Sequence, residues 1–298
     1  MTRASTTFLV CAAACGVFQI AAAPGAFADP ILLAQLAKSA VLGGSTVTNT
    51  GATTLTGDIG VSPGSSITGK ATITVNGTNA ATIGNPSVHE ADAFAMMAQN
   101  QFVTAKARLG FFGPGTLLPV DLAGLTLFPG VYTVPAGVSN LTGTLTLDGL
   151  SNANALWVFQ MPSTLITSPG SAVNVTNTGA GAGLYWNVGS SATLDTTTSF
   201  QGNILALMNI ALNTGAGIGC GRALAHVEAV TMDNNTISTG CSGFLAGSNG
   251  LSGGLAGTPA SNAPVPEPAT MLLLGSGIAY FVAKKPGWAR RRKLELEA

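Results

Sequence analysis

The chain has 298 residues, a formal net charge of zero at pH 7, and charged side chains at only 8% of its positions. Residues 29–262 carry five basic and nine acidic residues, which excludes the basic stripe of a nucleic-acid-binding protein, so no nucleic-acid partner is expected. Valine, isoleucine and leucine recur throughout this stretch, which excludes a disordered chain and favours one domain with a substantial core.

Residues 1–28 are typical of a secretory signal peptide. Arg3 precedes an apolar run over residues 8–23, and Ala26-Phe27-Ala28 places small residues at the cleavage position. We therefore expect an exported mature chain that begins near Asp29.

A repeat governs the stretch from residue 29 to residue 241. Residues 192–196 align with residues 210–214 and then with residues 230–234, at offsets of 18 and 20. Alternating apolar runs and glycine corners at such a period indicate a solenoid of stacked parallel strands, with an antiparallel sandwich as the alternative. Residues 157–160 likewise resemble residues 185–188.

One amphipathic helix is predicted over about residues 87–109. Ser87 and Glu90 can form a capping box, apolar residues then recur at steps of three and four, and Gly110 can end the helix in the left-handed conformation. A lone helix among strands is expected to lie against the solenoid.

Two cysteines, Cys220 and Cys241, remain once Cys11 and Cys15 leave with the signal peptide. They lie 21 residues apart, about one turn of the repeat, so a disulfide between adjacent turns is favoured over two free thiols. No second cysteine or histidine cluster accompanies them, and neither a metal nor another cofactor is expected.

The residues that could support catalysis are scattered. His89 and His226 are far apart in the sequence, and most aspartates sit beside glycine or asparagine, where carboxylates cap turns. No spacing indicates the facing carboxylates of a glycosidase, so no enzyme is expected and a polysaccharide-active enzyme is a distant alternative.

Threonine alternates with other residues in several short runs. Thr46, Thr48 and Thr50 share one side of a predicted strand. In stacked strands such side chains form a rigid grid, about 4.8 Å apart across strands, that can order water and adhere to ice. The alternative is that threonine is simply a good residue for an exposed strand.

Six ordered motifs between residues 31 and 240 resemble the DUF3494 ice-binding family. They lie at residues 48–64, 141–148, 157–160, 202–206, 221–225 and 230–237. The resemblance implies a mainly β fold: a discontinuous right-handed parallel β-solenoid of triangular cross-section with one long helix alongside. It also implies adsorption to ice by one flat face, without a cofactor or enzymatic activity.

The family's ice-binding residues follow no strict motif. Residues 50–53 match a Thr-Gly/Ala-x-Thr/Asn pattern of some members, residues 178–181 and 214–217 match its first half, and three more threonines recur in successive turns. The predicted ice-binding residues, expected on one face, are Thr50, Thr53, Thr178, Thr196, Thr198, Thr214 and Thr236.

Residues 242–263, rich in Gly, Ser and Ala, are predicted to be a flexible linker before a C-terminal sorting signal. In residues 264–298 an apolar run over 271–283, short for a membrane span, precedes basic residues that favour a cytoplasmic terminus. This tail resembles the PEP-CTERM signal, which implies transient insertion in the inner membrane and exosortase processing in a Gram-negative bacterium; a plain tail anchor is the alternative. The residues that carry the resemblance are Pro266, Glu267, Pro268, Arg290, Arg291 and Arg292.

These observations predict an exported, monomeric protein at the cell surface whose partner is the surface of an ice crystal. Extracellular polysaccharide is a further candidate partner. The alternative is a structural or adhesive protein of the extracellular matrix that uses the same scaffold without ice activity.

Overall fold

The computed structural model describes residues 30–254, so the predicted signal peptide and sorting signal lie outside the described residues. Over this range no helix is both long and apolar enough to cross a membrane. Successive strands fall on three faces, named A, B and C, and pair in parallel except for the hairpin of β6 and β7.

Face A lies beneath the long helix. It consists of β1 (Ser39–Gly43), β4 (Asp58–Val61), β8 (Val88–Glu90), β9 (Thr116–Leu117), β11 (Gly130–Thr133), β13 (Leu156–Met161), β16 (Gly183–Val188) and the ends of β18 (Ser199–Ala206) and β20 (Gly217–Ala225). Face B consists of β2 (Thr46–Thr50), β5 (Ser66–Thr68), β14 (Leu165–Ile166), β17 (Ala192–Leu194), β19 (Ile210–Leu212) and β21 (Val230–Asp233).

Face C completes each turn. It consists of β3 (Thr53–Thr56), β6 (Ile73–Val75), β7 (Thr78–Asn79), β10 (Thr126–Leu127), β12 (Thr144–Asn152), β15 (Ala172–Thr178), β22 (Thr236–Ser238) and the first residues of β18 and β20. A bulge between Phe200 and Gln201 marks where β18 passes from face C to face A.

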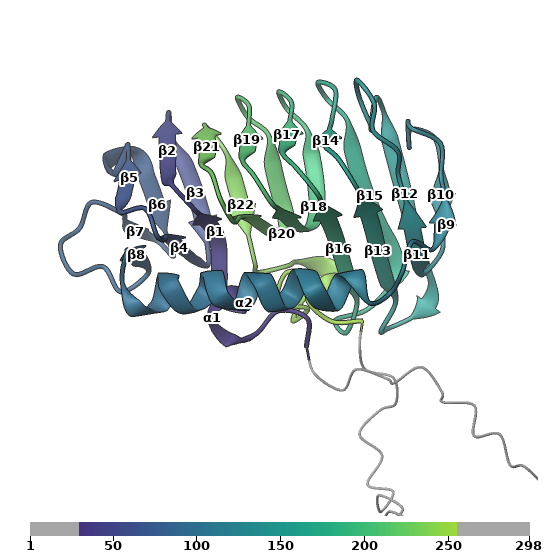
Figure 1. Ribbon diagram of the computed structural model, residues 1–298, viewed down its shortest axis with the longest axis horizontal. Helices are drawn as coiled ribbons and strands as arrows, with labels where there is room; N and C mark the ends of the chain where they lie inside the picture. The colour runs from purple at the N-terminus through teal and green to yellow at the C-terminus, as the bar shows by residue number, and fades with distance from the viewer. Residues whose placement is uncertain (1–29, 255–298) are drawn as a thin grey trace, which may run out of the picture. The chain divides into compact units, whose positions relative to one another are not determined.

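The stack of turns does not follow the order of the sequence. The last strands, β21 and β22, pair with the early strands β2 and β3, so the C-terminal turn lies between its predecessor and the N-terminal turn. The chain passes from one end of the stack to the other through α2 (Ala93–Gly110), which runs alongside the strands (Figure 1). The fold is therefore a discontinuous parallel β-solenoid with one long helix, as predicted.

The repeat recognised in the sequence is the stacking of turns. Ala192 pairs with Ile210, which pairs with Val230, at the offsets that the alignment predicts. The second similarity is out of register by one residue, because Trp157 pairs with Leu184 and not with Tyr185. A shift of one residue exchanges the two sides of a strand, so the pairing keeps Phe159 and Trp186 inside, with ring centroids 4.1 Å apart.

The predicted start of the helix is wrong. Val88–Glu90 form β8, which pairs with β4, and Ser87 accepts a hydrogen bond from Asn76 Nδ2 at 2.9 Å instead of capping a helix. The helix begins after Asp92, whose carboxylate accepts from the Ala95 amide at 2.8 Å. Gly110 is the last helical residue, and the left-handed glycine follows at Gly113 (φ 72°).

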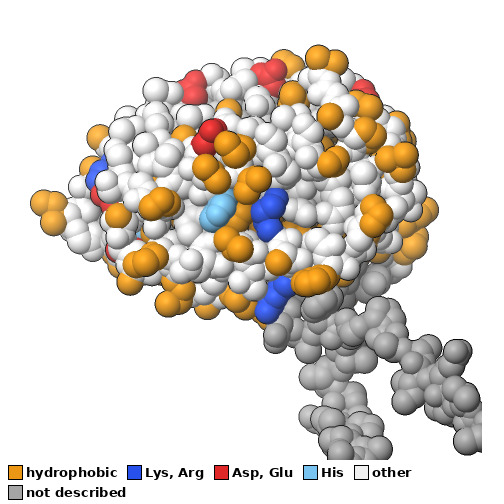
Figure 2. All heavy atoms as spheres, viewed as in Figure 1, with side chains coloured by type: hydrophobic (Ala, Val, Ile, Leu, Met, Phe, Trp, Pro, Cys, Tyr) orange, Lys and Arg blue, Asp and Glu red, His pale blue; other side chains and the backbone are white. Residues whose placement is uncertain are grey.

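Helix α2 buries one side on face A. Ala98, Phe102 and Leu109 pack with Leu205 and Leu224 in a cluster separate from the core inside the coil. The short helix α1 (Ala34–Lys38) packs against α2 and closes the same cluster. The outer surface around α2 carries few, scattered charged side chains (Figure 2).

Of the linker predicted over residues 242–263, residues 255–263 lie outside the described residues, and residues 242–254 are folded. They hold the 3₁₀ helix η2 (Gly243–Leu245), and both Leu245 and Leu251 are buried. The Leu251 carbonyl accepts from the Leu184 amide at 2.9 Å, which fixes this segment to β16. The small residues that suggested flexibility instead allow close backbone contact: a side chain on Gly253 would meet Gly181 O at 2.1 Å.

A disulfide joins Cys220 of β20 to Cys241, with Cα atoms 5.0 Å apart. It anchors the segment that follows β22. Replacing both cysteines with serine should lower the free energy of unfolding by about 3 kcal/mol, because the bond closes a loop of this length in the unfolded chain. Urea unfolding of the wild type and the double variant measures the loss, and a reductant should shift the wild type alone. Equal stability of the two proteins would contradict the prediction.

Candidate functional site

The corner between faces B and C is the same in successive turns. Gly51, Thr197, Gly215 and Asn234 all have positive φ, between 50° and 75°. Backbone hydrogen bonds link these corners: the Thr197 amide donates to Thr214 O, and the Gly215 amide donates to Asp233 O. The ends of the face B strands are therefore held in register.

Polar side chains turned inward support this corner. Thr198 is 1% exposed, and its Oγ1 lies 2.9 Å from Thr167 Oγ1. Thr53 is 2% exposed; its Oγ1 donates to Asn49 Oδ1 at 2.7 Å and accepts from the Asn235 amide at 3.1 Å. The prediction that Thr53 and Thr198 contact ice is therefore wrong, because neither reaches the surface.

The outward side of face B carries one continuous rank of uncharged side chains, four of them threonines. The strand pairings align its members without a bulge, at the spacing of about 4.8 Å between neighbouring strands. In spatial order they are Ile166, Thr193, Ala211, Thr231, Thr48 and Thr68. We call this set the central rank; it contains no charged group.

At the edge of face B, a hollow of about 320 Å³ is lined by Thr48 and Thr231 of the central rank and brings together three predicted residues, Thr50, Thr196 and Thr214. The aspartates at this edge are bound within the protein. Asp195 accepts from Asn213 Nδ2 at 2.9 Å, and Asp233 accepts from Thr214 Oγ1. The hydrogen bond from Asn213 lowers the pKa of Asp195 below its ordinary value.

The remaining candidates lie elsewhere, so the expectation of a single face is wrong. Thr236 points outward on face C, where it pairs with Gly217 and Thr54. Thr178 is half-buried at the end of β15, and its hydroxyl donates to Asn152 O at 2.7 Å. Both belong to strands of face C, so neither extends the central rank of face B.

The sequence-based list misses the centre of face B: Thr48, Thr68, Thr193 and Thr231. The alternation of residues within β2 shows that Thr48 points outward. The pattern within a single strand does not show which turns are neighbours in the stack. The order β21, β2, β5 becomes visible only in the discontinuous stack.

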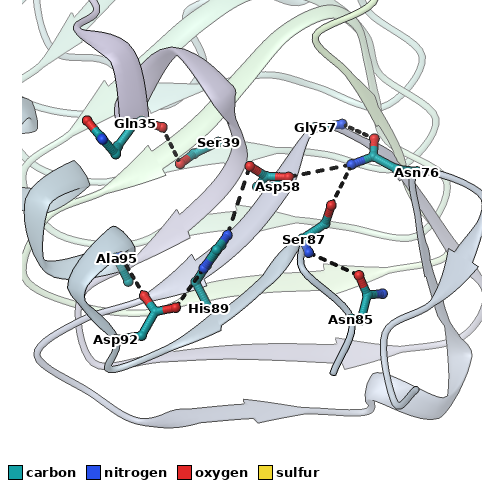
Figure 3. Close-up of polar contacts among 10 residues, drawn as sticks. All are labelled: Gln35, Ser39, Gly57, Asp58, Asn76, Asn85, Ser87, His89, Asp92 and Ala95. Atoms are coloured by element: carbon teal, nitrogen blue, oxygen red, sulfur yellow. Dashed lines mark hydrogen bonds and ion pairs between the residues drawn. The ribbon is translucent and has the colours of Figure 1, made fainter. Parts of the chain in front are cut away.

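A second polar cluster surrounds His89 at the start of α2 (Figure 3). Its Nδ1 lies 2.7 Å from Asp92 Oδ2, its Nε2 lies 3.9 Å from Asp58 Oδ2, and its ring stacks on Phe94. Burial raises the pKa of Asp92, but hydrogen bonds from the Ala95 amide and His89 outweigh it and lower the pKa overall. Asp58 belongs to β4, His89 to β8, and Asp92 caps α2, so the cluster connects these two strands to the helix.

The second histidine, His226, is not part of the cluster around His89. His226 stacks on Phe102 and lies 2.8 Å from Gln99 Oε1. Burial and then Lys106 lower the pKa of His226. Among residues 30–254, no group of three or more His, Cys, Asp or Glu side chains could hold a metal ion.

Comparison with known proteins identifies two regions. The profile of the family described as ice-binding-like matches residues 41–238, and that of the PEP-CTERM protein-sorting motif matches residues 264–293. An ice-binding protein of Nostoc sp. (strain HG1) is 43% identical over 264 residues, which cover 86% of this chain and 89% of that protein.

Two solved structures are similar to the described fold. An ice-binding protein from an Antarctic biological consortium is 40% identical, with a TM-score of 0.62 over 70% of this chain and 91% of its own. An ice-binding protein of the Antarctic ascomycete Antarctomyces psychrotrophicus is 35% identical, with a TM-score of 0.62 over 70% of this chain and 98% of its own.

Proposed function

We propose that this chain, which belongs to the ice-binding-like family, adsorbs to ice through face B. The bound chain inhibits the growth or recrystallisation of ice. The PEP-CTERM motif indicates export and sorting at the surface of a Gram-negative bacterium, where such adsorption protects the surroundings of the cell. The function is one of binding, with no cofactor and no catalytic step.

The central rank carries the proposal. Its side chains project from strands that are locked in register, so their methyl and hydroxyl groups repeat at a nearly constant spacing. Threonine in a strand has few rotamers, so little side-chain entropy is lost when the rank meets an ordered surface. An uncharged, regular surface can hold water molecules in a lattice-like array.

Face C is less suited to a lattice. Its register is interrupted between Asp148 and Asn152. Gly217 also places a gap between Ser199 and Thr236, because glycine has no side chain. These interruptions favour face B over face C as the ice-binding surface.

Replacing Thr231 with tyrosine should lower ice recrystallisation inhibition by about tenfold or more, equivalent to about 1.4 kcal/mol. The ring would stand above the middle of the central rank and hold neighbouring side chains away from ice. Thr231 is exposed, so the free energy of unfolding should change by less than about 0.5 kcal/mol. Recrystallisation inhibition and thermal unfolding of the same samples separate the two effects.

Thr54→Tyr is the matched control, since Thr54 is an exposed residue on face C, where it pairs with Thr236 and Thr74. It should retain full activity. Loss of activity in Thr54→Tyr alone would move the ice-binding surface to face C. A folded wild type without any ice activity would overturn the proposal and favour the matrix-adhesion alternative.

A further inference from the structure

The side chains of face A beneath α2 change from apolar to polar along the stack. One cross-strand rank of face A runs through Leu42, Leu224 and Leu205, which the apolar side of the helix covers. The same rank continues into Asn187, Gln160 and Thr133. The helix ends at Gly110, and a cavity of about 490 Å³ opens there, lined by Lys106, Gly110, Pro114, Thr133, Gln160 and Asn187 among others.

A chain of hydrogen bonds fixes the orientation of both amides in this cavity. The Leu109 carbonyl can only accept, so Gln160 presents Nε2 to it at 2.6 Å. Gln160 Oε1 then accepts from Asn187 Nδ2 at 2.6 Å, which leaves Asn187 Oδ1 as the free end. That oxygen is buried and has no hydrogen-bond partner among the described residues. A buried acceptor without a partner costs about 1–3 kcal/mol, so a donor that reaches it would be bound favourably.

Lys106 supplies the complementary group. Its ammonium donates to Val188 O at 2.7 Å and Leu205 O at 3.2 Å, which uses two of its three hydrogens. Both Lys106 and Asn187 line the cavity, so a donor and a buried, unpartnered acceptor lie in its wall. Met161, Pro114 and Pro162 provide apolar wall between these polar groups.

The paired donor and acceptor select one class of ligand. A fully deprotonated anion such as sulfate could accept from Lys106 but could not donate to Asn187 Oδ1. An ammonium group could donate to the oxygen but would be repelled by Lys106. A hydroxyl group does both. A ring that carries several hydroxyl groups could form hydrogen bonds with the polar groups of the cavity while its apolar surface packs against the proline and methionine wall. The volume of the cavity lies within the range of small-molecule sites, about 300–1,000 Å³.

We propose that the cavity at the C-terminal end of α2 binds a neutral hydroxylated ring the size of one pyranose unit. The cavity opens on the helix side, whereas the ice-binding proposal concerns face B. A chain with both surfaces could hold a sugar-containing polymer and ice at the same time. The two proposals can fail independently.

The test is a titration of the folded protein with methyl glucoside, followed by the backbone amide shifts of Gly110, Gly113 and Gly189. These shifts should move together and saturate. Inorganic sulfate, used as an anionic probe without a hydrogen-bond donor, should leave them unchanged. Saturating shifts with sulfate but none with the glucoside would overturn the assignment of ligand class, and no shifts with either probe would overturn the site.

Two variants locate the binding. Gly110→Leu should abolish it, because Gly110 lines the cavity and an added Cβ there meets no atom within 4 Å, so the larger side chain fits without a clash and occupies space at the site. Asn187→Leu should weaken it by up to about tenfold through loss of one hydrogen bond. Ala107→Leu, exposed on the same helix, is the matched control and should bind like the wild type. Unchanged binding in a folded Gly110→Leu variant would place the ligand elsewhere, and ice activity should be equal in all three variants.

Discussion

Replacing Arg222 with methionine should lower the free energy of unfolding by about 3–5 kcal/mol, because it removes the donors to several buried oxygens that belong to three separate segments. Arg222 is 0% exposed. Its guanidinium donates to Asn203 Oδ1 at 2.7 Å, to Asn249 O at 2.9 Å and to Gly250 O at 3.2 Å. It also donates to Ala37 O through Nε at 3.1 Å.

These partners explain the size of the effect. They connect the segment before β1, the middle of β18 and the segment after β22, which are distant in sequence. Methionine would fill much of the space but leave several buried oxygens without donors. Burial lowers the pKa of Arg222 to about 10, so the group is still charged at neutral pH.

Arg222→Lys is the informative partner variant. Lysine keeps the charge but lacks the planar fork that reaches several acceptors at once, so we expect a loss smaller than that of Arg222→Met. Urea unfolding of both variants and the wild type gives the three free energies. A loss below about 1 kcal/mol in Arg222→Met would contradict a supporting role for the guanidinium.

The architecture was predictable because it repeats. The similarity of residues 192–196, 210–214 and 230–234 reflects stacking of neighbouring turns, and the helix follows from its spacing of apolar residues. The start of the helix was not predictable locally. Ser87 and Asp92 are both good capping residues, and the pairing of β8 with β4 decides in favour of Asp92.

The candidate site was less predictable than the fold, for a geometric reason. Period-two alternation assigns outward residues within a strand, but a left-handed residue at each corner breaks the alternation. Thr196, Thr197 and Thr198 are chemically identical neighbours, yet Thr197 has φ 57° and Thr198 is turned into the core. Composition likewise concealed the folded segment 242–254, because small residues suit both linkers and close packing.

Thr198→Tyr should therefore unfold the protein rather than block its ice-binding surface, with a loss of about 3 kcal/mol or more in the free energy of unfolding. The ring has no space beside Thr167 and Ser171, whose hydroxyls lie 2.9 Å and 3.4 Å from Thr198 Oγ1. Thermal unfolding should show a lower midpoint, and any loss of ice activity should follow the unfolded fraction.

Thr196→Tyr, two positions earlier at the hollow of face B, separates burial from surface contact. It should keep the stability of the wild type to within about 0.5 kcal/mol, because Thr196 is only half-buried and lines the open hollow. A Thr198→Tyr variant as stable as Thr196→Tyr would show that the corner can open, and Thr198 would again be a candidate for contact with ice. Thr198→Val tests the hydroxyl alone: it keeps the shape, and loss of the bond to Thr167 should cost about 1 kcal/mol.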